Sequence, residues 1–137
     1  MSARSLQYYV IARRWASELE FFKIETAFFR RLLDDYSFRL SDQAYFEEFK
    51  RTGRELFELE EESARAGMLL IKQLKHVELM AEDIIPENAE ELAINQVHLE
   101  YLMTNITRDY REVKKSLFQL VENVLKDNKR ITGLSVN

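Results

Sequence analysis

The stretch that decides the fold is WASELEFFKIETAFFRRLL, residues 15–33. Along it, side chains that are apolar or neutral recur at alternating spacings of four and three residues: Trp15, Leu19, Phe22, Thr26, Phe29 and Leu33. Because an α-helix completes a turn in about 3.6 residues, this spacing places them on one face of a helix. Two carboxylates, Glu18 and Glu25, lie beside that face. They either belong to a site or form the charged edge of a packing surface.

The same spacing runs from Tyr8 to Leu40 and then appears twice more, and we call each such series a seam. The second seam is Phe46, Phe49, Gly53, Leu56, Glu60, Ser63, Gly67, Leu70, Leu74, Val77, Ala81 and Ile84. The third seam is Leu92, Gln96, Leu99, Met103, Ile106, Tyr110, Val113, Leu117, Leu120 and Val124. Seams sustained over this many turns are typical of long helices that pack as in coiled coils.

We therefore expect an all-α fold, an antiparallel up-down-up bundle of three long helices at about residues 4–39, 42–84 and 88–131, with coiled-coil-like packing. One proline and three glycines are too few for the turns of a strand-rich fold. The alternative is a four-helix bundle in which the second helix breaks near Gly53. In both cases residues 1–137 form a single helical-bundle domain, long enough to bury a core.

Local signals support these helix ends. Ser41 or Asp42 can cap the start of the second helix. Pro86 ends that helix, and Asn88, followed three residues later by a glutamate, suits the start of the third. Gly133 suits the end of the third helix.

The glycines also suggest a register for the first two helices. If the chain reverses near residue 41, facing residues have numbers that add up to about 82, because both helices rise equally per residue. Trp15 then faces Gly67 and Phe29 faces Gly53, so large side chains meet small ones. We expect Gly67→Leu to overpack this core at a cost of about 1–3 kcal/mol.

Charge is spread unevenly along the chain, whose net charge is −4. Basic residues exceed acidic ones by two over residues 1–41 and by three over residues 101–137, whereas acidic residues are in excess by nine over residues 42–100. No dense basic block is present to meet phosphate groups. We therefore expect no nucleic-acid partner.

Nothing in the sequence predicts a membrane partner. The uninterrupted apolar runs are short: Met68 to Ile71 has four residues and Tyr8 to Ala12 has five, far below the about 18 that cross a bilayer. The N-terminal stretch lacks the apolar core of a secretion signal. Because the chain has no cysteine, disulfides, thiolate catalysis and Cys-ligated metals are excluded. We expect a cytoplasmic protein.

Glu18, Glu25 and Glu60 are the candidate ligands of an interior metal or small-ligand site. Glu60 falls on the second seam itself, whereas the other two lie at the shoulder of the first. The Glu-x-x-His pairs of carboxylate-bridged metal bundles are absent from the sequence. Arg14 lies four residues before Glu18, and Arg65 is expected to face it. We therefore interpret the carboxylates as partners in ion pairs, and expect no metal and no cofactor.

His76 and His98 are the two histidines, expected at about one height on the second and third helices. Two imidazoles supply half of a zinc site, and the third ligand would have to be Glu78 or Glu100. We interpret both as surface histidines, with metal binding as the alternative. No Ser–His–carboxylate arrangement and no glycine-rich phosphate loop follows from the spacings, so no catalytic residues are expected and we expect no enzyme.

Apolar residues exceed what three seams use. The surplus lies on helix faces turned away from the seams: Phe21, Phe28, Phe57, Met68, Ile71, Ile94, Val97 and Tyr101. Such faces on a soluble protein usually mark a partner surface. We therefore predict a homodimer or another helix-on-helix assembly through these residues, and the alternative is a monomer with a broad core.

Two functions are consistent with these patterns. The first is a non-enzymatic interaction or scaffold protein that self-associates through its helix faces and can present a groove to a partner-protein helix. The second is a helical bundle with a buried, carboxylate-lined metal or small-ligand site. Glu60→Leu separates them: stability stays the same or rises if Glu60 serves packing, and binding is lost if Glu60 serves a ligand.

Overall fold

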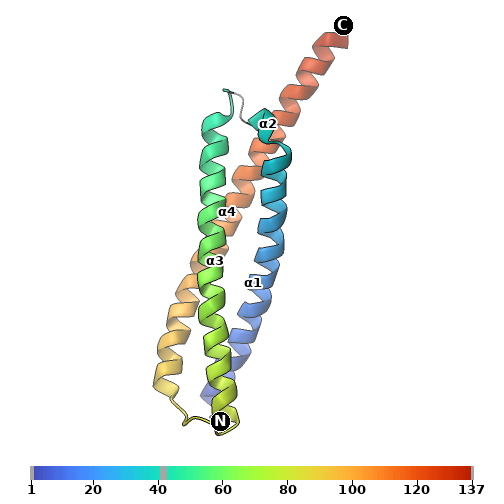
Figure 1. Cartoon of the computed structure of the whole chain (residues 1–137). Helices are drawn as coiled ribbons and strands as arrows, with labels where there is room; N and C mark the ends of the chain where they lie inside the picture. The colour runs from blue at the N-terminus through green and yellow to red at the C-terminus, as the bar shows by residue number, and fades with distance from the viewer. Residues whose placement is uncertain (1, 41–42, 137) are drawn as a thin grey trace.

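The computed structural model describes residues 2–40 and 43–136, with the side chains of residues 2–39 and 43–127. The helices are α1 (Ala3–Asp35), α2 (Ser37–Leu40), α3 (Phe46–Ala81) and α4 (Ala89–Val136). The described residues contain no strand, so the predicted all-α class is confirmed. Figure 1 shows α1, α3 and α4 lying side by side, with α2 where the chain passes from α1 to α3. None of the described helices combines the length and apolar character that crossing a membrane requires.

The three long helices run up, down and up (Figure 1). α3 passes through Gly53 without interruption, so the break that the four-helix alternative needs is absent there. α3 begins at Phe46, later than predicted, and the expected caps Ser41 and Asp42 lie outside the described residues. α4 continues through Gly133, where we predicted its end, so that prediction is wrong.

The connection between α3 and α4 has the predicted break and the predicted cap. α3 ends at Ala81, before Pro86, and Asp83 adopts a left-handed φ of 57° between them. The Glu91 amide donates a 3.1 Å hydrogen bond to Asn88 Oδ1. This contact satisfies one of the amides that a helix start leaves without a partner.

Side chains from all three long helices form the core. In α1, the seam residues from Ala12 to Leu33 are buried, as predicted. In α4, all ten residues of the third seam, from Leu92 to Val124, are buried. Full burial of one large apolar side chain contributes about 1.5–3 kcal/mol, so these two seams supply much of the drive to fold.

Of the twelve residues predicted for the second seam, only three are fully buried: Leu56, Leu70 and Val77. The buried residues of α3 are Thr52, Leu56, Leu59, Ala66, Leu70, Gln73, Val77 and Met80. Leu56 matches the prediction, but Leu59 is buried in place of Glu60, and Ala66 in place of Gly67. Steps of three and of four residues from Leu56 both fit the helical period, so spacing alone does not select between them.

The register of α1 against α3 also differs from the prediction. Arg30 pairs with Glu60, so facing residues have numbers that add up to 90 rather than about 82. The two sums differ by about eight residues, close to one heptad. The shift arises because α2 and the loop after it place the chain reversal beyond residue 41.

Gly53 and Gly67 therefore do not make room for Phe29 and Trp15. A Cβ atom at either glycine would have no neighbour within 4 Å. The predicted overpacking by Gly67→Leu is wrong, because the space beside this residue is open.

Candidate interaction site

The feature that stands out is a groove between α1 and α3, which we call the α1/α3 groove. Its volume is about 640 Å³. Residues of α1 and α3 line it, and none of α4 does: Ala16, Leu19, Glu20, Lys23, Thr26, Ala27, Glu60, Ser63, Ala64, Gly67, Leu70 and Ile71. The groove therefore opens on the side of the α1–α3 pair that α4 leaves uncovered.

Small side chains keep this groove open. Five of its lining residues are Ala16, Ala27, Ser63, Ala64 and Gly67. No atom lies within 4 Å of the place where a Cβ of Gly67 would be. The Ser63 hydroxyl oxygen is buried and has no hydrogen-bond partner in the described part of the chain. A mid-helix glycine costs about 1 kcal/mol of stability relative to alanine. No close packing within the chain requires a glycine at position 67.

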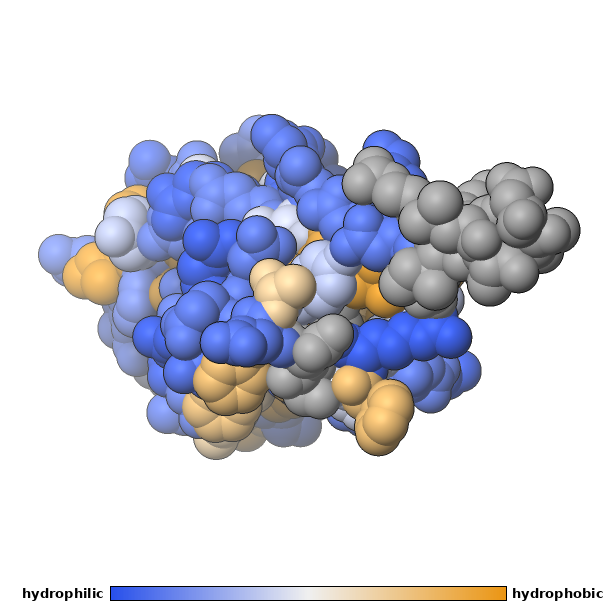
Figure 2. All heavy atoms as spheres, turned by 90° about the horizontal axis from the view of Figure 1, so that it is seen from above, coloured by the Kyte–Doolittle hydropathy of each residue, from blue (hydrophilic) through white to orange (hydrophobic). Residues whose placement is uncertain are grey.

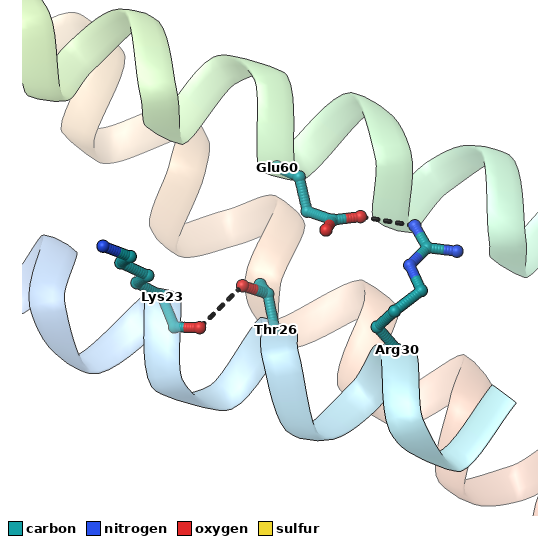
Figure 3. Close-up of polar contacts among 4 residues, drawn as sticks. All are labelled: Lys23, Thr26, Arg30 and Glu60. Carbon is teal, nitrogen blue, oxygen red and sulfur yellow. Dashed lines mark hydrogen bonds and ion pairs between the residues drawn. The ribbon is translucent and has the colours of Figure 1, made fainter. Parts of the chain in front are cut away.

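An ion pair joins α1 to α3 beside the groove (Figure 3). The Arg30 guanidinium donates to a carboxylate oxygen of Glu60, and both side chains remain about one-third exposed. One turn earlier, the Thr26 hydroxyl donates a 3.2 Å hydrogen bond to the carbonyl oxygen of Lys23. Glu60 thus reaches across to α1 at the surface and does not point into the core.

The eight predicted interface residues are all exposed, with exposed fractions between 43% for Phe28 and 72% for Met68. Figure 2 shows hydrophobic residues reaching an otherwise mainly hydrophilic surface at separate places. The eight belong to different faces. Ile71 lines the α1/α3 groove, while Phe21 lies on the side of α1 that faces α4. These residues are thus exposed but do not form one patch, and their role as an interface stays a prediction.

Ile24 extends the apolar character of the groove onto α1. It is 63% exposed and lies about one turn from Glu20 and Ala27, which line the groove. On α3, Met68 lies about one turn from the lining residues Ala64 and Ile71. Both helices thus carry an exposed apolar side chain beside the groove.

The interface between α1 and α4 is filled, in contrast. The rings of Phe22 and Phe29 lie 4.8 and 5.7 Å from the ring of Tyr110, centroid to centroid. The Tyr110 hydroxyl donates a 2.7 Å hydrogen bond to Glu25, and Lys114 lies 3.9 Å from the same carboxylate. Burial, and then the hydrogen bond to Glu25, raises the pKa of Tyr110 to about 12.

Glu25 and Glu60 therefore serve two different helix pairs. Glu25 contacts α4 and Glu60 contacts α1. Glu18 is partly buried on α1 and shares none of these contacts. Within residues 2–40 and 43–136, no group of three or more His, Cys, Asp or Glu side chains is arranged to hold a metal ion. The carboxylate-lined site would need contacts that this arrangement does not bring together.

The histidines and Arg65 lie elsewhere. His76 is partly buried on α3, and His98 is exposed on α4. Arg65, which we expected to face Glu18, instead lines an acidic pocket of about 450 Å³ between α3 and α4. In that pocket, burial and then a hydrogen bond to Asp109 raise the pKa of Glu62.

The three helix pairs thus differ in character: α1 and α4 share a filled aromatic interface, α3 and α4 border an acidic pocket, and α1 and α3 leave an apolar groove open. Comparisons with family models, with curated proteins and with solved structures found no match.

Proposed function

We propose that the protein is a non-enzymatic interaction or scaffold protein of the cytoplasm that self-associates as a homodimer. The contact surface is the outer side of α1 and α3, which we call the groove face: Ile24, Ala27, Phe57, Ala64, Met68 and Ile71. A second copy packed over the α1/α3 groove would cover these side chains together.

The observation that carries this proposal is an open apolar groove with exposed apolar residues beside it. Met68 and Ile71 are 72% and 69% exposed. Covering an apolar side chain of this size contributes about 1.5–3 kcal/mol when burial is complete. Soluble proteins rarely leave such residues together in water, and this supports a partner surface here.

The groove face is also large enough for a stable contact. α1 has 33 residues and α3 has 36, so each is about 50 Å long at 1.5 Å per residue. Two helices of about 10 Å width offer on the order of 1,000 Å², against about 800 Å² per partner in a standard interface.

Sedimentation velocity on the full chain tests the proposal. The wild type should sediment as a dimer, and Met68→Lys combined with Ile71→Lys should sediment as a monomer, because two charges would have to be buried. The matched control is Ile94→Lys with Val97→Lys on α4, since these side chains are 65% and 68% exposed away from the groove. The control should remain a dimer. A monomeric wild type, or equal loss of dimer in both variants, contradicts the proposal.

A further inference from the structure

We infer that the second copy binds with a two-fold axis parallel to the helices, so that α1 of each protomer lies antiparallel against α3 of the other. This inference rests on the proposed function and specifies its geometry. The two α1–α3 pairs would form a four-helix layer, with one α4 on each outer side. Each helix of this layer would have only antiparallel neighbours.

The contacts between α1 and α3 indicate the level of each residue along the bundle. The Arg30–Glu60 ion pair indicates that residues of α1 and α3 whose numbers add up to about 90 lie at similar levels. A two-fold axis parallel to the helices keeps every level, so the same rule relates α1 of one protomer to α3 of its partner. Ile24 and Met68 add up to 92, which places them within about 3 Å of one level.

Apolar residues then meet apolar residues across the interface. Ile24 of one copy lies opposite Met68 of the second. Ala27 lies opposite Ala64, whose numbers add up to 91, and both line the groove. Small side chains at the centre let the helices approach closely, and the larger ones beside them enter the partner's groove.

Charges on the same faces are complementary. Six exposed side chains, each three, four, seven or fourteen residues from a groove-face residue, pair by level as Arg31 with Glu61, Asp34 with Arg54, and Arg13 with Glu78. None of the six forms an ion pair among the described side chains. Lys75 also lies near the level of Arg13, and the negative charge of Glu78 offsets the repulsion between these two positive side chains.

The other two-fold arrangement is less complementary. With the axis perpendicular to the helices, α1 lies against its own copy and α3 against its own copy. When the apolar residues are centred, Arg31 gains Glu20 as a partner. However, Arg54 then lies opposite Lys75, because these two residues flank the apolar segment of α3 on both sides. Two positively charged side chains that face each other repel, which disfavours this arrangement.

Crosslinking distinguishes the two arrangements. The natural chain has no cysteine, so introduced cysteines are the only thiols. Ile24→Cys and Met68→Cys are made as separate full-length variants, mixed, treated with a short thiol crosslinker and weighed by mass spectrometry. We expect the mixed Ile24→Cys/Met68→Cys dimer to dominate. The control mixture of Ile94→Cys and Val97→Cys should stay uncrosslinked.

Each outcome is decisive. Efficient crosslinking of Ile24→Cys to itself, or a dimer without the mixed product, overturns the inferred arrangement while self-association stands. A monomer in sedimentation overturns the proposed function as well. Independently, Arg31→Glu should weaken the dimer about tenfold, and adding Glu61→Arg should restore it. Failure of the second change to restore the dimer also overturns the arrangement.

Discussion

The Tyr110 hydroxyl on α4 donates a 2.7 Å hydrogen bond to the Glu25 carboxylate on α1. Tyr110 belongs to the third seam and Glu25 lies beside the first, so one contact joins the two seams that the sequence predicts best. Lys114, also on α4, lies 3.9 Å from the same carboxylate, so α4 supplies both of its contacts.

Tyr110→Phe tests the contribution of this hydrogen bond. The change removes the hydrogen bond and keeps the ring against Phe22 and Phe29. We expect a loss of about 1–2 kcal/mol in the free energy of unfolding, because the acceptor is charged but Lys114 still lies near it. Urea unfolding measures the loss. An unchanged midpoint would show that this hydrogen bond contributes nothing to stability.

Glu87 gives a prediction about pH. The Ser2 backbone amide and the Ser5 hydroxyl donate hydrogen bonds of 2.9 and 2.8 Å to this carboxylate, which ties the N-terminus to the α3–α4 connection. The Ser2 amide, and then the two serine hydroxyls, lower the pKa of Glu87 from 4.5 to about 2. Because the folded-state pKa is the lower one, this contribution is present above pH 4.5 and is lost as the pH falls towards 2.

Glu87→Gln should therefore reduce the acid dependence of stability between these pH values, and Glu90→Gln serves as a control in the same region. Thermal unfolding across the range measures it. If both variants retain the full acid dependence, the contacts to Ser2 and Ser5 do not stabilise the fold.

Gln73 and Gln96 form a buried polar pair between α3 and α4. Gln73 Nε2 donates to Gln96 Oε1 at 3.3 Å and to the Leu92 carbonyl at 3.1 Å. Gln73 Oε1 and Gln96 Nε2 are buried without partners in the described part of the chain.

Gln96→Leu alone should cost about 1 kcal/mol, because it removes one partner of a buried amide. Adding Gln73→Leu should restore the stability or raise it above that of the wild type, because neither buried amide remains. Chemical denaturation of the single and double variants measures both effects. A double variant less stable than the single variant contradicts this account.

The space beside Gly67 is open, so adding a Cβ atom there should stabilise the fold and not overpack the core as the predicted register suggested. Gly67→Ala should stabilise the fold by about 0.5–1 kcal/mol, since no atom obstructs a Cβ there. Gly53→Ala should do the same. Gly67→Leu should instead weaken self-association, because Gly67 lines the groove and Gly53 does not. Melting curves and sedimentation together separate the two effects, and a less stable Gly67→Ala would contradict them.

The sequence predicts α1 and α4 well because large apolar side chains occupy most of their seam positions. α3 differs, because several of its buried positions carry small or polar residues such as Thr52, Ala66 and Gln73. Beside them, Gly53 and Gly67 look equally suited to close packing. Hydropathy therefore does not show which of two neighbouring residues turns inward.

The candidate site shows the same limit. The exposure of Met68 and Ile71 follows from their angles on the helix and is predictable. The groove beside them depends on the register of α1 against α3. That register shifts by about one heptad through α2 (Ser37–Leu40) and the loop after it. Periodicity carries no information about the length of such a connection.

Native mass spectrometry of the untagged full chain tests the central claim most directly. We expect a species of twice the 16.4 kDa chain mass, with no added ligand mass, and its loss in the Met68→Lys/Ile71→Lys variant. A monomer of 16.4 kDa at every accessible concentration would contradict it.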